Sequence, residues 1–455
     1  MGGSSSSRSS ENEVPNIAFL GFGGQRAIVD LMGSLVQLHN NEVPLLSSTT
    51  ELLGSIGRQR AMVDNMGGSS SRHSKSEVRI QHSLNEKEEA FVARRKKTVL
   101  QCLRKLQINC DWDNVPNIAL LGSGGGQRAM VGLLGSLVEL DKAGLLDCIL
   151  YLSGVSGSTW CMASLYKEPD WSTKLDTVKD KIIERLNGPG VSREDTYEKL
   201  TKYWESTGRD GKDFSMTHIW AAMVITTYVK EVIDEHTLTD QWDHLSKDPF
   251  PIYTVIDKQC KQQGDGDPWF EISPYEAGYS LTGAFVETSS FGSQFDNGRK
   301  IKEQPEMDML YLQGPLMLTS IHKCFDEWIW GRKYNFLHKM TDKTVPPALL
   351  KTETRDYIDA GLLNNSPYFS VLRKERDIDL IISLDFSEGD PFMTVRETAE
   401  MCKKLNIPFP EVNIPSEDVK KPKDFYVFKG QNAPTVIHIP LFNVVNCEGK
   451  LRLFS

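Results

Sequence analysis

NIALLGSGGGQRAMVGLLGSLVEL, Asn117 to Leu140, and CILYLSGVSGSTW, Cys148 to Trp160, decide the fold of this 455-residue chain. Each stretch begins with a short apolar run and breaks at a glycine-rich turn, and Arg128 to Leu140 then carries apolar residues at helical spacing. The expected elements are strands over Asn117 to Leu121 and Cys148 to Leu152, and helices over Arg128 to Leu140 and Thr159 to Tyr166. This order predicts a βαβ unit whose two strands end in glycine-rich turns that point the same way.

The two turns fit two different chemistries. Gly124 to Ala129 matches G-x-G-x-x-A, a dinucleotide-binding pattern that also needs an acidic residue after the second strand, where the chain has Ser153 and Gly154 instead. GVSGS, Gly154 to Ser158, matches the sharp turn that carries a nucleophilic serine, here Ser156, although its fifth residue is serine rather than glycine. A pentapeptide of this kind is common by chance, so by itself it favours a plain turn.

The neighbouring glycine loop favours the nucleophile. A serine that attacks an ester generates an oxyanion, and backbone N–H groups stabilise it. Gly125, Gly126 and Gly157 offer such groups with no side chain in the way. Arg128 is placed to neutralise a substrate phosphate; the alternative is a surface arginine, which is mildly unfavourable in the first turn of a helix.

Composition narrows the class of protein. Acidic residues number 61 and basic residues 52, a net charge of −9 that argues against nucleic acid as a partner. No window is long and apolar enough to span a membrane, and the start lacks a secretory core. The sequence contains neither a C-x-x-C pair nor a histidine cluster at metal-ligand spacing. We therefore expect no metal, no cofactor, reduced cysteines and a cytoplasmic protein. The eight cysteines are Cys102, Cys110, Cys148, Cys161, Cys260, Cys324, Cys402 and Cys447.

The first 84 residues form a different region. Val14 to Leu38 and Leu52 to Val63 are imperfect copies of Val115 to Leu140, set among serine-rich tracts too poor in apolar residues to form a core. The copies are too irregular and too few for a solenoid. We expect residues 1–84 to be a disordered, low-complexity leader and residues 85–455 to be the folded domain.

Two segments are candidates for membrane contact. Gly2 and Ser6 fit the N-myristoylation pattern, whose plain alternative is a disordered serine-rich start. One such chain binds membrane only marginally, so a second signal is needed. Ala90 to Gln107 is amphipathic and basic, and either supplies that signal or packs on the domain with a solvated basic face.

Further motifs reveal a resemblance. The chain contains, in this order, GSGGGQRAMVG, YLSGVSGSTW, SPYEAGY, FGSQF, YIDAGLLNNSPY, LIISLDFSEGDPF, IPFPEV and TVIHIPLFN. With these motifs in the family's order, between about Glu86 and Asn446, the chain resembles the group IV family of cytosolic phospholipases A2, most closely its gamma form. The resemblance implies a layered α/β fold with a central mixed sheet, a serine elbow and a Ser/Asp dyad without histidine.

Carried over by motif, the resemblance assigns residues and activity. It implies Ser156 as nucleophile, Asp359 of YIDAG as its partner, oxyanion donors on Gly125 and Gly126, and phosphate contacts from Arg128 and Arg376. It also implies a phospholipase A2 or lysophospholipase that forms an acyl-serine, which water hydrolyses or from which a lysophospholipid accepts the acyl group. Because no C2 domain precedes the catalytic region, the resemblance implies activity without calcium. Such an enzyme associates reversibly with intracellular membranes.

Three alternatives stay open. His322, His338 or His438 can complete a conventional triad, although His438 in TVIHIPLF has the pattern of a core strand residue. Phe214 to Val229 can line an apolar funnel for acyl chains or simply belong to the core. The chain ends where relatives continue with further helices and has no prenylation box, so we expect a truncated domain, with a weakly active lipid-binding or regulatory protein as the second hypothesis.

Overall fold

The computed structural model describes residues 77–206, 221–231, 235–264, 266–313 and 331–441. The expected leader up to residue 76, the myristoylation site and the end of the chain beyond residue 441 lie outside these ranges. Arg79 and Ile80, which precede the expected boundary at residue 85, pair with Phe285 and Ala284 in the sheet.

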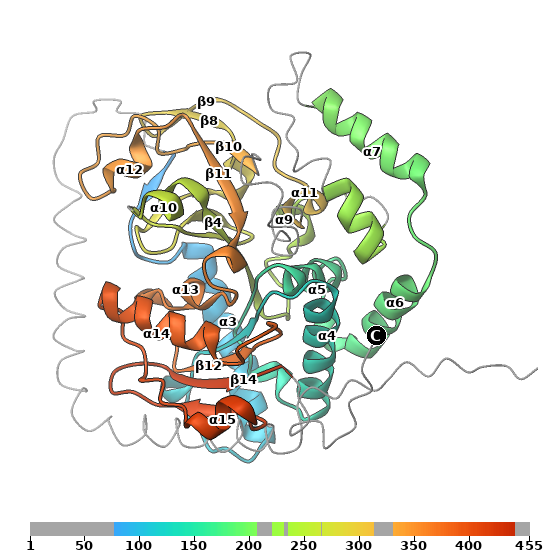
Figure 1. The fold of residues 1–455 in the computed structure, drawn as a ribbon, viewed down its shortest axis with the longest axis vertical. Coiled ribbons are helices and arrows are strands. Elements are labelled where there is room, and N and C mark those ends of the chain that lie inside the picture. Colours follow the sequence, from blue (N-terminus) through green and yellow to red (C-terminus); the bar gives the residue numbers. More distant parts are fainter. Residues whose placement is uncertain (1–76, 207–220, 232–234, 265, 314–330, 442–455) are drawn as a thin grey trace, which may run out of the picture.

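A twelve-stranded mixed sheet runs through the molecule and confirms the α/β fold (Figure 1). Its main path is β1-β7-β6-β5-β4-β3-β2-β12-β14-β13; β11 pairs with β4, and β10 pairs with β11. The strands are β1 (Arg79–Ile80), β2 (Ile118–Gly122), β3 (Tyr151–Gly154), β4 (Phe250–Asp257), β5 (Trp269–Ile272), β6 (Glu276–Tyr279), β7 (Ala284–Glu287), β10 (Arg332–Tyr334), β11 (Thr354–Asp359), β12 (Leu380–Leu384), β13 (Tyr426–Phe428) and β14 (Thr435–Ile439). A separate two-stranded sheet contains β8 (Gln294–Asp296) and β9 (Arg299–Lys302).

Helices cover both faces of the sheet (Figure 1). They are α3 (Glu86–Lys105), α4 (Gln127–Lys142), α5 (Gly157–Tyr166), α6 (Leu175–Asn187), α7 (Arg193–Ser206), a π-helix (Ala221–Val229), α9 (Leu238–Gln241), α10 (Lys258–Gln263), α11 (Met309–Gln313), α12 (Pro347–Leu350), α13 (Tyr368–Val371), α14 (Met393–Leu405) and α15 (Ser416–Lys420). Among the described helices, none is long and apolar enough to cross a membrane.

The predicted βαβ unit is present at the centre of the sheet. β2 and β3 are parallel, with Gly122 opposite Gly154, and α4 and α5 follow them. β3 begins three residues later than expected, because Leu146–Cys148 form a 3₁₀ turn. β2 is buried on both faces: Ile118 and Leu120 pack with α4 and α5, whereas Ala119 and Leu121 face the core shared with α13 and α14. This explains its continuous apolar run.

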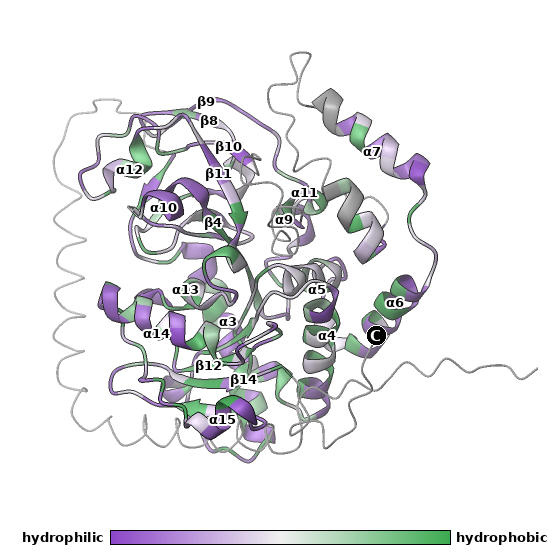
Figure 2. Ribbon diagram, in the orientation of Figure 1, coloured by the Kyte–Doolittle hydropathy of each residue, from purple (hydrophilic) through white to green (hydrophobic). Residues whose placement is uncertain are grey.

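The amphipathic segment packs against the domain. Asn85 caps α3 by accepting a hydrogen bond from the Lys87 backbone N–H, and Phe91, Val99 and Leu103 on the helix are buried. The packed alternative is therefore the one the structure shows. In Figure 2, β12 is mainly hydrophobic, β9 is mainly hydrophilic, and α14 is hydrophilic on part of its surface.

Candidate active site

Ser156 sits on a sharp turn between β3 and α5. Its φ of 51° and ψ of −122° lie in a region that non-glycine residues rarely adopt, and such strain costs about 1–3 kcal/mol. A side chain on Gly157 would collide with the Gly126 carbonyl oxygen. Within the described residues, the buried Ser156 Oγ has no hydrogen-bond partner. These features are those of a nucleophile elbow rather than of a plain turn.

The sheet directs Asp359 toward Ser156. Gly154, at the end of β3, pairs with Tyr253 of β4, and Asp359, at the end of β11, pairs with Val255 two residues further along β4. β11 runs antiparallel to β4, so β3 and β11 point at each other along one edge of that strand, with ends about 7 Å apart at 3.3 Å per residue. The expected strand-end position of Asp359 is confirmed, although its strand runs opposite to β3.

The Asp359 carboxylate is buried and oriented. Its Oδ1 accepts a hydrogen bond of 2.8 Å from the Gly361 backbone N–H, in the 3₁₀ turn Ala360–Leu362 that follows β11. Its neighbours Ile358 and Ala360 share an apolar cluster with Val155, which precedes the serine. Packing of these neighbours holds the two strand ends relative to each other.

The glycine loop closes over the elbow. Gly126, with φ of 59°, precedes α4, and its carbonyl lies directly against Gly157. Within the described residues, the N–H groups of Gly125, Gly126 and Gly157 make no hydrogen bonds. The N-termini of α4 and α5 both lie here without side-chain caps, so their dipoles favour negative charge. The arrangement suits an oxyanion.

Arg128 lies at the solvent side of this loop. Its Nε donates to the Phe386 carbonyl at 3.0 Å, and its Nη1 lies 3.9 Å from the exposed carboxylate of Glu388. The side chain is 40% exposed, and its Nη2 lies close to Gly125. A cation held in this way is accessible to an anionic substrate group.

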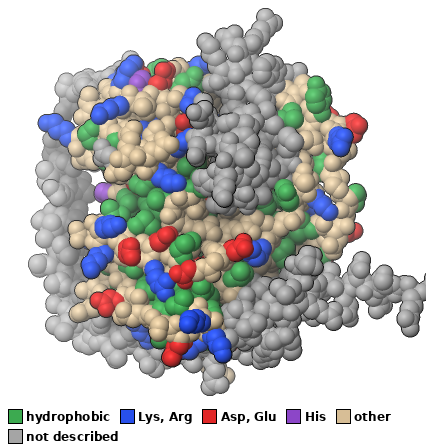
Figure 3. Space-filling model, in the orientation of Figure 1, with side chains coloured by type: hydrophobic (Ala, Val, Ile, Leu, Met, Phe, Trp, Pro, Cys, Tyr) green, Lys and Arg blue, Asp and Glu red, His purple; other side chains and the backbone are tan. Residues whose placement is uncertain are grey.

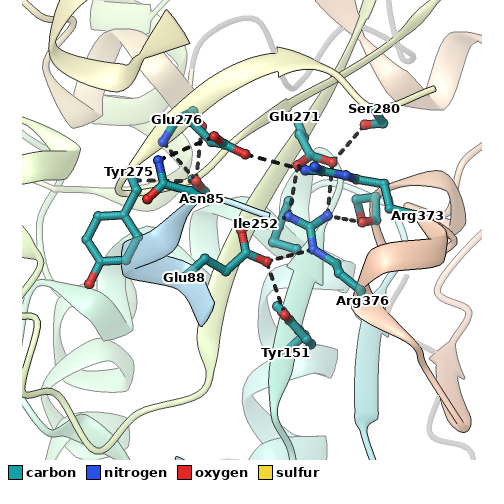
Figure 4. A network of polar contacts seen from close by, with 12 residues as sticks. Asn85, Glu88, Tyr151, Ile252, Glu271, Tyr275, Glu276, Ser280, Arg373 and Arg376 are labelled. Atoms are coloured by element: carbon teal, nitrogen blue, oxygen red, sulfur yellow. Dashed lines mark hydrogen bonds and ion pairs between the residues drawn. The ribbon is translucent and has the colours of Figure 1, made fainter. Parts of the chain in front are cut away.

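Arg376 lies elsewhere, and its expected phosphate contact needs correction. The side chain is fully buried in an ion network next to Tyr151 of β3 (Figure 4). Its five N–H groups all donate to protein atoms. Its partners are Glu88 of α3, Glu271 of β5 and the Ser370 carbonyl. A guanidinium saturated by carboxylates has no donor left for a substrate phosphate.

Two of the histidines considered for a triad, His338 and His438, lie on strands away from Ser156 or after them. His438 is buried on β14, three strands from β3 and so about 14 Å away at 4.8 Å per strand. Burial lowers its pKa, and its Nε2 lies 2.7 Å from the Pro391 carbonyl. His338 follows β10, where its backbone N–H bonds to Asn335. His322 falls outside the described residues.

One site residue went unrecognised in the sequence. Asn365, in the loop that follows Asp359, donates from Nδ2 to the Gly124 carbonyl at 3.2 Å and to Ser387 Oγ at 2.8 Å. The only sequence signal was its position in YIDAGLLNNSPY. Within the described residues, no group of three or more His, Cys, Asp or Glu side chains can hold a metal ion.

The fold and the geometry of the site indicate a hydrolase, and comparison with known proteins agrees. Residues 118–378 match the family described as the lysophospholipase catalytic domain, which is more than half of the chain. The chain therefore belongs to this family of hydrolases.

Its relatives place it within that class. Human cytosolic phospholipase A2 gamma is 30% identical, over 84% of this chain and 89% of the relative. The mouse gamma enzyme is 29% identical, over 80% and 83%. The solved human GIVD cytosolic phospholipase A2 superposes with a TM-score of 0.71 at 27% identity, over 82% of this chain and 60% of that one. The chain is thus a gamma-like member of the group IV cytosolic phospholipases A2.

Proposed function

We propose that this protein hydrolyses acyl esters of glycerophospholipids and lysophospholipids through a Ser156–Asp359 dyad, without calcium. The observation that carries the proposal is the meeting of β3 and β11 along β4, which brings an elbow serine and a buried carboxylate together beside free backbone N–H groups. The names of the relatives favour a phospholipid as the substrate.

The reaction follows from the roles of these groups. Ser156 Oγ attacks the acyl carbonyl while Asp359 accepts its proton, and the N–H groups of Gly125, Gly126 and Gly157 stabilise the oxyanion. Collapse expels the glycerol oxygen, which takes the proton from Asp359, and leaves an acyl-serine. Water then releases the fatty acid, or a lysophospholipid accepts the acyl group.

Access to lipid requires contact with a membrane surface. Leu362 and Leu363, next to Asp359, and Met401 on α14 are partly exposed, and Met393 and Leu405 at the ends of α14 are exposed. Figure 3 shows hydrophobic side chains among acidic and basic ones on this face of the molecule. We include reversible peripheral binding to intracellular membranes in the proposal, because apolar side chains near the site can enter a lipid interface.

The first test measures fatty-acid release from mixed phosphatidylcholine and lysophosphatidylcholine micelles with excess chelator. We expect the parent to be active and Ser156→Ala and Asp359→Asn to lose at least about 10³-fold in kcat, because the dyad acts as a unit. The exposed Ser192→Ala and Asp377→Asn variants are matched controls and should retain parental activity.

The controls separate the proposal from its competitor. If the parent binds lipid but is as inert as both dyad variants while folded, a lipid-binding or regulatory protein is the better interpretation. Activity that disappears with chelator would contradict the proposed independence of calcium.

A further inference from the structure

Asn365 joins the loop that carries Asp359 to the loop that carries the oxyanion donors. The Gly124 N–H donates to the Asn365 backbone carbonyl at 3.1 Å, and the Asn365 Nδ2 donates back to the Gly124 carbonyl at 3.2 Å. Asn365, 241 positions away in the chain, thus bonds both backbone polar groups of Gly124, and the adjacent Ser123 Oγ also donates to the Gly124 carbonyl at 3.3 Å.

The second of these bonds has a consequence for the next residue. The Gly124 carbonyl and the Gly125 N–H belong to the same peptide group, which is planar and trans, so the two bonds point in opposite directions. An amide that holds this carbonyl also fixes the direction of the Gly125 N–H. Glycines on both sides leave the backbone unusually free to rotate, so the direction needs an external anchor.

The anchor is itself fixed from behind. Asn365 Nδ2 also donates to Ser387 Oγ at 2.8 Å, and the Ser387 backbone N–H donates to the buried Asp385 carboxylate at 2.8 Å. Both Asp385 and Ser387 directly follow β12, next to β2 in the sheet. The amide therefore rests on the sheet core.

Contact with the nucleophile is equally close. A side chain on Gly124 would collide with Asn365 Oδ1 and would lie 3.0 Å from the Ser156 Cβ. The Asn365 amide and the serine thus lie against the same glycine Cα. Asn365 Oδ1 is buried and has no partner among the described residues.

We propose that Asn365 is the positioning residue of the oxyanion site: its side-chain amide sets the direction of the Gly125 N–H through the shared peptide plane and keeps it in register with Ser156 and Asp359. This inference rests on the proposed hydrolase function. It assigns Asn365 no contact with substrate, so its loss acts on the transition state rather than on substrate binding.

The test compares Asn365→Ala with Asn364→Ala in the full chain. Asn364 is a matched control, because its amide bonds Thr394 and Thr398 on α14 and not the glycine loop. With lysophosphatidylcholine micelles we expect Asn365→Ala to lower kcat about 10- to 100-fold with KM within threefold, since losing one oxyanion donor outright costs about 10²- to 10³-fold. Asn364→Ala should stay within threefold of the parent in kcat per folded molecule.

A second variant has a pH signature that a merely structural role would not produce. In Asn365→Asp, the ionised carboxylate repels the Gly124 carbonyl, but the protonated acid can donate to it. We expect the ratio of this variant's kcat to that of the parent to rise at least about threefold from pH 8 to pH 5. The ratio cancels the titration of the dyad, which both proteins share.

Three outcomes decide the matter. Parental kcat in folded Asn365→Ala, an equal loss in Asn364→Ala, or a kcat ratio for Asn365→Asp that does not change with pH would each overturn the inference. Labelling with methyl gamma-linolenyl fluorophosphonate, a probe found bound to the solved human GIVD relative, distinguishes failure of the inference about Asn365 from failure of the proposed hydrolase function. A parent labelled at Ser156 upholds the proposed function, whereas an unlabelled parent removes both.

Discussion

In the proposed reaction, Arg128 is the described side chain that we expect to contact the phosphate of the substrate. Its guanidinium is half-exposed beside the glycine loop, and its Glu388 neighbour is too exposed and distant to neutralise it. We expect Arg128→Gln to lower kcat/KM for lysophosphatidylcholine about tenfold, the loss of roughly one charge-assisted hydrogen bond, and to leave kcat/KM for a monoacylglycerol within threefold. Parallel assays on the two esters measure this difference.

The control for this prediction is Arg396→Gln, which removes a comparably exposed arginine of α14 that pairs with Asp390. It should leave both esters unaffected. An equal loss on both substrates in Arg128→Gln would show that this arginine supports the loop and does not contact phosphate.

The sequence singled out the residues whose role depends on local chain geometry. Ser156 and Gly157 were predicted because a tight strand-to-helix turn requires small neighbours, and the structure shows that turn. Arg376 was misplaced because its burial depends on Glu88 and Glu271, which lie 288 and 105 positions away. No local pattern distinguishes an arginine saturated by distant carboxylates from one that faces a ligand.

At the scale of elements, the βαβ unit was predictable because its strands are short continuous apolar runs that end in glycine-rich turns before helical segments. The pairing of β11 with β4 was not predictable. The two strands run antiparallel and are about 100 residues apart in the sequence, as in the pair Tyr357 and Asp257, so no local pattern indicates that they meet. The same holds for the ion network that joins α3, β3 and β5 to Arg373 and Arg376 (Figure 4). Its members are scattered over almost 300 residues.

This network predicts how stability depends on pH. Burial would raise the pKa of Glu271, but the positive charges of Arg376 and Arg373 hold it at about 2. A carboxyl with a depressed folded pKa contributes stability above its unfolded value, near 4.3, and loses it as the pH falls toward 2. We expect about 3 kcal/mol of unfolding free energy to disappear over this window, and Glu271→Gln to have a shallower slope there, measured by urea unfolding.

Glu271→Gln should also be less stable than the parent at pH 7, because it leaves two buried arginines without their shared carboxylate. Glu287→Gln, a change at an exposed glutamate on β7, is the control and should follow the parental curve. An unchanged slope in Glu271→Gln would show that other carboxyls dominate acid unfolding.

At the scale of the whole molecule, we expect a chain that starts at residue 77 and a chain that starts at residue 85 to differ in stability. The change in composition placed the boundary at residue 85, but Arg79 bonds the buried Glu276 carboxylate at 2.5 Å, and β1 extends the sheet. A chain that starts at residue 85 leaves Glu276 without this cation. We expect it to be less stable than a chain that starts at residue 77 by about 2 kcal/mol, the scale of a hydrogen bond to a charged group.

Thermal unfolding of the two truncated chains, with Arg79→Ala in the longer one, separates the possible causes. If the ion pair accounts for the effect, Arg79→Ala will unfold near the temperature of the shorter chain; if pairing of β1 with β7 dominates, it will unfold near that of its parent. Equal unfolding temperatures for all three chains would restore the boundary at residue 85. The strand and the arginine act together on the β6–β7 edge, which reaches β4 through β5. Loss of residues 77–84 should therefore destabilise the edge of the sheet first and affect the dyad only indirectly.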